Sequence, residues 1–218
     1  MDYLWFLIIL APLAAAGLVK ATFAKYNKVQ TRGGRNAADI AREILDANGL
    51  HHVQVVEHPG NLTDHYDPRS QTVALSNSVY RSVAVGAIAV AAHEVGHAIQ
   101  HATEYTPIKI RTSIFPLVNI TSRVWIFVLL AGFMFEMMNL VWIAILLFSF
   151  GVLFQLITLP LEIDASSRAM KTITENGYLV GDEIDGARKT LTAAAFTYFV
   201  ALVISVLQLL RLLSNARR

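Results

Sequence analysis

The chain has 218 residues, 55% of them hydrophobic and only 16% charged, and its mean hydropathy is +0.48. It is too apolar for an ordinary soluble domain and predicts membrane-spanning segments. The net charge of +2 is small and the basic residues do not alternate with aromatic ones, so we expect no nucleic-acid partner. Because the chain lacks cysteine, any metal must be bound by histidines and carboxylates.

Four apolar stretches approach the ~20 residues that cross a bilayer. They are residues 3–19, 114–135, 140–161 and 192–213. The first stretch ends in small residues, as a signal peptide does. However, a signal peptide begins with basic residues, whereas this stretch is preceded by Asp2 and by no lysine or arginine, so we interpret it as an uncleaved anchor. An interfacial helix is an alternative for the last stretch.

Basic residues gather on one side of these stretches. Residues 20–113 and 162–191 hold 14 of the 18 lysines and arginines, and the turn at 136–139 holds none. The positive-inside rule therefore predicts that both segments face the cytoplasm. Arg211, Arg217 and Arg218 conflict with this orientation if the last stretch spans the membrane.

The polar segment after the first span predicts both helices and strands. Asn36 can cap a helix over residues 37–48. The β-branched runs 53–57 and 72–76 predict short strands, with a loop at 61–70 between them. Asn77 or Ser78 can then cap a second helix that continues to His97.

This second helix carries the motif HEVGH at residues 93–97. Residues four apart share a helix face, so His93 and His97 can bind one metal ion, and Glu94 projects to the side, as a general base should. The alternative is that these residues are packed polar groups at the end of an alanine-rich helix. Burying three ionisable groups is costly unless they are paired, which favours the metal site.

An intramembrane protease of the site-2 type is a further alternative for this helix. The apolar run before His93 has only about ten residues, which is too short for a span. The Asp-Gly pair that such enzymes need occurs only at Asp185 and Gly186, outside any clear span.

Catalytic zinc usually has three protein ligands, so a third ligand must come from elsewhere. The stretch LPLEIDASSRAM returns to the same membrane side after two spans. Glu162 and Asp164 are about 200° apart on a helix, so only one can face the metal. We predict Glu162 as the ligand and an Asp164–Arg168 ion pair on the other face. Ordinary interfacial charges are the alternative for this stretch, and His101 is rotated away from His93.

A family resemblance rests on LTDHYDP at 62–68, VALS at 73–76, AAHEVGHAIQ at 91–100 and LEIDASSRAM at 161–170 after paired spans. The chain resembles the small bacterial membrane zinc metallopeptidases of the YugP-like type and, more distantly, HtpX-type membrane proteases. This implies an α-helical integral membrane protein with about four transmembrane helices and a small α+β gluzincin-like zinc protease domain. The implied segments are an anchor at 1–19, a cytoplasm-facing protease domain at 20–113, a transmembrane hairpin at 114–161, a third-ligand segment at 162–191 and a transmembrane or interfacial helix at 192–218.

The resemblance also implies roles for single residues. It makes His93, His97 and Glu162 the zinc ligands and Glu94 the base. Gluzincins commonly place an aspartate four residues after the ligand glutamate, where this chain has Ser166, whose hydroxyl can still form a hydrogen bond.

The predicted function is zinc-dependent hydrolysis of peptide bonds by an endopeptidase of the bacterial cell membrane. Substrates would be proteins or peptides, including membrane proteins, and would add to an edge strand containing Val73 and Leu75. Candidates for stabilising the oxyanion are Tyr66, His65 and Arg168. A non-catalytic zinc scaffold would not need Glu94, and a metal transporter would need more polar residues inside the spans than these offer.

Overall fold

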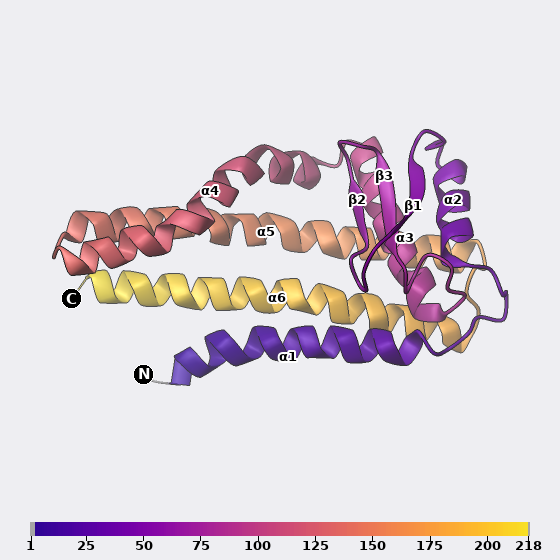
Figure 1. Ribbon diagram of the computed structural model, residues 1–218, viewed down its shortest axis with the longest axis horizontal. Helices are drawn as coiled ribbons and strands as arrows, with labels where there is room; N and C mark the ends of the chain where they lie inside the picture. Colours follow the sequence, from indigo (N-terminus) through magenta and orange to yellow (C-terminus); the bar gives the residue numbers. More distant parts are fainter. Residues whose placement is uncertain (1–2, 218) are drawn as a thin grey trace. The chain divides into compact units, whose positions relative to one another are not determined.

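The structure is a computed structural model that describes residues 3–217, with side chains from residue 6 onward, so Asp2 and Arg218 lie outside it. Helices dominate the described chain, and three short strands form its sheet (Figure 1). In chain order the elements are α1 (Tyr3–Tyr26), α2 (Ala37–Ala47), β1 (Gln54–His58), β2 (His65–Asp67), β3 (Thr72–Ser76), α3 (Val85–Ala102), α4 (Thr106–Met134), α5 (Met138–Glu175) and α6 (Asp182–Ala216).

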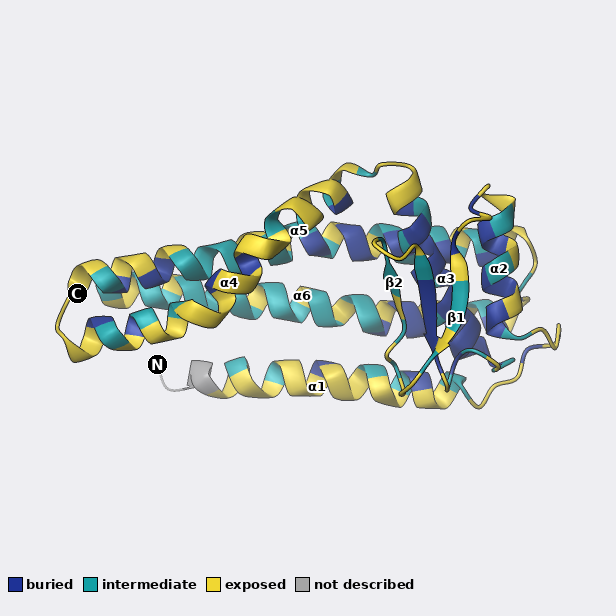
Figure 2. Cartoon of the chain, turned by 45° about the horizontal axis from the view of Figure 1, so that its top comes forward, coloured by how far each residue is buried: buried dark blue, intermediate teal, exposed yellow. Residues whose placement is uncertain are grey.

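Four of the described helices, α1, α4, α5 and α6, are long and apolar enough to cross a membrane. Together with the small sheet they confirm the predicted fold class. Much of α1 carries the colour of exposed residues in Figure 2, and each of the following apolar side chains of α1 is at least half exposed: Phe6, Leu7, Ile9, Leu10 and Leu13. Such a surface is suited to lipid rather than water.

The chain divides into two compact units. One, which we call the globular unit, comprises Ala15–Tyr105 and Glu162–Phe196 and contains α2, α3 and the sheet. The other comprises the first part of α1, Thr106–Leu161 and the chain from Thr197 onward. The change from one unit to the other at Glu162 falls inside the continuous helix α5.

Helix α2 forms for local reasons. The Asn36 side chain accepts a hydrogen bond from the Asp39 backbone N–H at 2.9 Å and so caps the first turn. Its apolar side chains recur on one face, and Ile40, Ile44 and Leu45 are almost fully buried. The helix ends before Gly49, whose φ of +72° is the left-handed conformation that glycine adopts most easily.

The sheet has the order β1-β3-β2, with β1 parallel and β2 antiparallel to β3. Residues 72–76 are therefore the central strand and not an edge. Strand β2 lies inside the stretch that the sequence predicts as a loop, because a strand of three residues is too short to show an alternating pattern.

Helix α3 runs through the core of the globular unit. Its alanine and valine side chains are buried against α2, the sheet, the end of α5 and the start of α6. The helix begins at Val85, so the predicted cap at Asn77 or Ser78 is wrong. Those two side chains instead contact Glu57 and Asn61. The backbone bridge between Gln30 and Ala84 keeps the chain extended up to the start of α3.

Candidate metal centre

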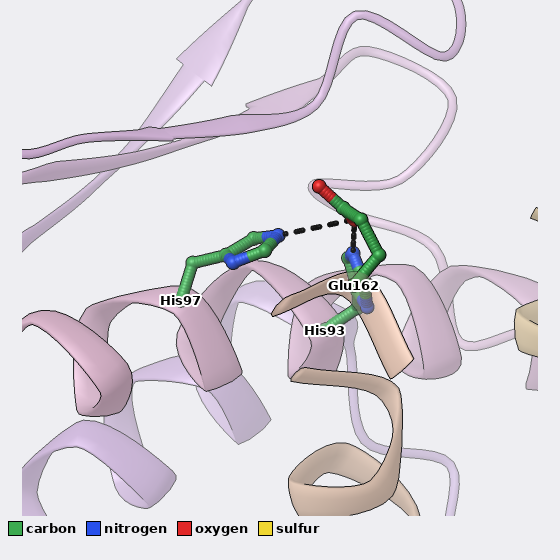
Figure 3. A group of neighbouring side chains, drawn as sticks. All are labelled: His93, His97 and Glu162. Atoms are coloured by element: carbon green, nitrogen blue, oxygen red, sulfur yellow. Dashed lines mark ion pairs between the residues drawn. The ribbon is translucent and has the colours of Figure 1, made fainter. Parts of the chain in front are cut away.

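Two helices of the globular unit bring three potential ligands together (Figure 3). His93 and His97 project from one face of α3, and Glu162 projects from α5. The Oε2 atom of Glu162 lies 3.3 Å from His93 Nε2 and 3.5 Å from His97 Nε2. The side chains of the three residues are 13%, 11% and 4% exposed, respectively. Such a cluster is stable in a protein interior only if its charges are compensated.

The spacing of these atoms suits a small tetrahedral metal ion. Ligand atoms ~2.1 Å from a tetrahedral zinc are roughly 3.4 Å apart. The two separations from Glu162 are close to this value, and all three ligand atoms lie within 4.8 Å of one another. Two imidazoles and one carboxylate also form a common ligand set of catalytic zinc sites. The residues present therefore fit a zinc ion that keeps a further coordination position for water or substrate.

Gly96 explains how the two helices approach closely enough. A Cβ atom at this position would lie 2.7 Å from the carbonyl oxygen of Ala165 on α5. Backbone atoms cannot move aside as a flexible side chain could, so only glycine permits this contact. Gly96 lies between His93 and His97, and Ala165 follows Glu162 by three residues, so the contact places the ligands opposite one another.

The other ring nitrogen of each histidine has an oxygen partner. His93 Nδ1 lies 3.2 Å from Ser166 Oγ, so the serine contacts one of the two candidate ligand histidines. His97 Nδ1–H donates to Gln100 Oε1 at 2.9 Å, which fixes the tautomer in which Nε2 has a free lone pair. Both histidines are thus oriented with Nε2 toward Glu162.

Gln100 belongs to a longer chain of contacts. It is fully buried and donates through Nε2 to Asp164 Oδ2 at 2.8 Å. The same oxygen accepts a hydrogen bond from Arg168 Nε at 2.6 Å, which confirms the predicted Asp164–Arg168 ion pair. The guanidinium of Arg168 lies over the ring of Tyr105, 5.5 Å from its centroid. This series of contacts links α5 to His97. It also keeps the Asp164 carboxylate away from the three-residue ligand group.

Glu94 lies next to the candidate ligands and is not one of them. Its side chain belongs to the buried part of α3, and the three-residue ligand group does not include it. Burial by itself would lower the pKa of His97, but hydrogen bonding to Glu162 and the negative charges of Glu94 and Glu162 raise that pKa above its usual value. The site thus has a net preference for positive charge, which a metal cation would satisfy in place of the proton.

The remaining candidate residues have other partners. Tyr66 Oη lies 3.1 Å from His101 Nδ1, and His101 is exposed and outside the three-residue ligand group. His65 Nδ1 contacts the Thr63 carbonyl oxygen, and its ring packs edge-on against His58. Arg168 is engaged by Asp164. No described contact joins Tyr66, His65 or Arg168 directly to His93, His97 or Glu162.

The predicted substrate strand needs correction. Val73 and Leu75 are fully buried in β3, which pairs on both sides, with β1 and with β2. Its backbone groups are occupied, so a substrate cannot add there. The edges left without a strand partner among the described residues belong to β1 and β2, and β2 also packs against α3.

The LTDHYDP stretch has a structural explanation. Asp64 accepts hydrogen bonds from the backbone and hydroxyl of Ser76 at 2.7 and 2.9 Å, which ties the start of β2 to the end of β3. Asp67 accepts from the Arg69 backbone and the Ser70 hydroxyl and so closes the turn into β3. These carboxylates hold the sheet that lies against α3 and do not reach the metal group.

A membrane protein that joins two histidines of one helix to a carboxylate of another has the features of a metallohydrolase. The chain belongs to the family described as "putative neutral zinc metallopeptidase", which it matches over residues 2–217. It is 46% identical over 212 residues to the "putative membrane protease YugP" of Bacillus subtilis (strain 168), an alignment that covers 94% of each chain. No solved structure matches the chain. The family resemblance found in the sequence is thereby confirmed.

Gly96→Ala should disrupt the metal centre. The added methyl group would press on the Ala165 carbonyl and push α3 away from α5, so zinc content measured by elemental analysis should fall sharply. Gly151→Ala in α5 is the matched control, because a Cβ there meets no atom within 4 Å. Full zinc occupancy in Gly96→Ala would contradict the role given to this contact.

Gln100→Leu should weaken the metal centre without removing a ligand. Loss of a partner that orients a ligand histidine typically lowers metal affinity by ~10- to 100-fold. Competition with a fluorescent zinc chelator would measure the change. Gln54→Leu, at an exposed position of β1, is the control and should leave the zinc affinity unaltered. Equal zinc affinities in the unaltered protein and in both variants would show that Gln100 does not orient His97.

Proposed function

We propose that this chain is a zinc-dependent membrane endopeptidase. The observation that supports this most directly is the convergence of His93 Nε2 and His97 Nε2 on one oxygen of Glu162, with Glu94 next to His93 on the same helix. Family membership and the membrane-protease relative agree with it. The arrangement corresponds to that of gluzincins, whose third ligand is a glutamate.

Each residue of the candidate site has a separate role in peptide hydrolysis. His93, His97 and Glu162 would hold the zinc ion, which supplies Lewis-acid activation of water and of the scissile carbonyl. Glu94 accepts a proton from the attacking water and transfers it to the departing amine. Ser166 and Gln100 keep the two imidazoles oriented.

The substrate would add as an extended strand to the open edge of β2. This edge takes the place of β3 as the proposed site of substrate addition, because among the described residues β2 pairs with β3 on one side and with no strand on the other. Tyr66 of β2 contacts His101 one turn beyond His97, so the strand runs close to the helix that carries the ligands. Main-chain hydrogen bonds at such an edge accept many sequences, which suits protein and peptide substrates, including membrane proteins.

An intramembrane mechanism receives no support from the structure. Helix α3 is not among the four described helices that are apolar enough to span a membrane. Glu162, in contrast, directly follows the apolar run of α5. Cleavage would therefore take place at the surface of the bilayer. The basic residues flanking the spans support the proposal that this surface is the cytoplasmic side of the bacterial cell membrane.

Glu94→Gln should separate catalysis from metal binding. The variant should retain zinc and lose cleavage of casein by ~100-fold or more, the usual contribution of a general base. Glu175→Gln, which removes an exposed carboxylate at the end of α5, should remain active. A Glu94→Gln protein that cleaves casein at the normal rate would contradict the proposed enzymatic mechanism. If the unaltered protein and both variants bind zinc but none cleaves casein, the result would favour a non-catalytic zinc scaffold.

Single cysteines in this cysteine-free chain test the orientation. His52→Cys lies at an exposed site of the globular unit, and Met137→Cys lies at the exposed turn between α4 and α5. A membrane-impermeant thiol reagent should label Met137→Cys in intact cells and His52→Cys only after lysis, since two spans crossing once each put their turn on the opposite side. The reverse pattern would place the candidate site outside.

A further inference from the structure

The end of α1 and the start of α6 lie side by side in the globular unit (Figures 1 and 2), and their side chains line a groove. Its volume is about 460 Å³, and its lining includes two lysines, a tyrosine, two threonines and three apolar residues. From α1 these are Leu18, Thr22, Lys25 and Tyr26, and from α6 they are Lys189, Thr192, Ala193 and Phe196. None of them belongs to the metal centre.

The lining changes from charged to apolar along the groove. Lys25 and Leu18 are seven residues apart on α1, and Lys189 and Phe196 are seven apart on α6, which is about 10 Å along each helix. Lys25 follows the apolar part of α1, and Lys189 precedes the apolar part of α6. One end therefore presents two ammonium groups and the other presents Leu18 and Phe196, which are 47% and 44% exposed.

Among the described residues, no carboxylate lines the charged end of the groove. In the described part of the chain, no salt bridge involves Lys25 or Lys189. Lys25 lies 5.4 Å from the centroid of the Tyr26 ring, which leaves its charge available to a further partner. Two like charges at one end of a groove are stabilised by an anion bound between them.

The floor of the groove is held firmly. Tyr26 packs against Gly186 of α6, where an added Cβ would lie 2.8 Å from the Tyr26 ring. The backbone of Tyr26 and Asn27 similarly contacts Gly86 of α3, where a Cβ would meet it at 3.2 Å. The two lysines are thus displayed by helices whose contact allows little adjustment.

We propose that this groove binds an anionic phospholipid. The phosphate lies between Lys25 and Lys189, the threonine hydroxyls face the glycerol and ester region, and an acyl chain runs along Leu18 and Phe196. Basic pockets at the ends of membrane helices recognise lipid headgroups in this way. A free phosphate would satisfy the lysines but leave the apolar end exposed, and a neutral lipid would satisfy only the apolar end.

Titration of the full-length protein in detergent with short-chain phosphatidylglycerol tests the proposal. Bound lipid is counted by native mass spectrometry, and the midpoint of thermal unfolding is followed in parallel. Phosphatidylglycerol should bind and raise the midpoint, whereas phosphatidylcholine and inorganic phosphate at the same concentrations should not. An equal effect of phosphatidylcholine or phosphate would overturn the proposal. Zinc and proteolysis play no part in the readout, so the outcome is independent of the proposed function.

Matched variants locate the binding. Lys25→Gln with Lys189→Gln should lower the affinity for phosphatidylglycerol by roughly tenfold or more, because each lysine near an anionic lipid surface raises the affinity by roughly fivefold. Thr192→Trp should also lower it by filling the groove without changing the charge. Lys20→Gln with Arg188→Gln removes two exposed charges from the same helices outside the groove and should leave the affinity unchanged. Unaltered binding in the first variant, or an equal loss in the last, would refute the site.

Discussion

The contact between Gly96 of α3 and the backbone of Ala165 of α5 is the constraint on which the candidate metal centre depends. A helix pair normally keeps its backbones apart by the size of the side chains between them. Here the missing side chain lets α5 approach until a Cβ would overlap the Ala165 carbonyl. The distances between the ligand atoms follow from this contact, since the histidines flank Gly96 and Glu162 precedes Ala165 by less than one turn.

Helix α5 contributes to the site through two rows of side chains. Glu162 and Ser166, four residues apart, contact the histidines, while Asp164 and Arg168, also four apart, form the ion pair that reaches Gln100. One helix thus supplies both a potential ligand and the groups that orient another. Because these groups lie on a rigid helix rather than a loop, displacement of one would displace all of them, and the site is positioned as a whole.

Helix α5 also carries a long apolar segment directly before these residues. The apolar run of α5 ends at Leu161, and the buried carboxylate follows at the next residue. The helix is continuous across this change, so the charged residues of the candidate site directly follow a long apolar segment along α5. Helices α1 and α6 change from apolar to basic in the same manner, which produces a groove with a charged end and a lipid-like end. The candidate metal centre and the groove both contain residues from helices that carry a long apolar segment and continue into the globular unit.

The sequence by itself determined the features that depend on local spacing. The apolar stretches predicted the four long helices, the Asn36 cap predicted α2, and the helical periods predicted which side chains could face one ion and that Asp164 would pair with Arg168. The tertiary structure alone decided which strand is central, where α3 begins and that Gln100 orients His97. These depend on partners far along the chain: β3 is enclosed by two strands, α3 starts where Ala84 meets Gln30, and Gln100 matters only because α5 presents Asp164 to it. A period of 3.6 or 2 residues describes one element, but it carries no information on which other element will lie beside it.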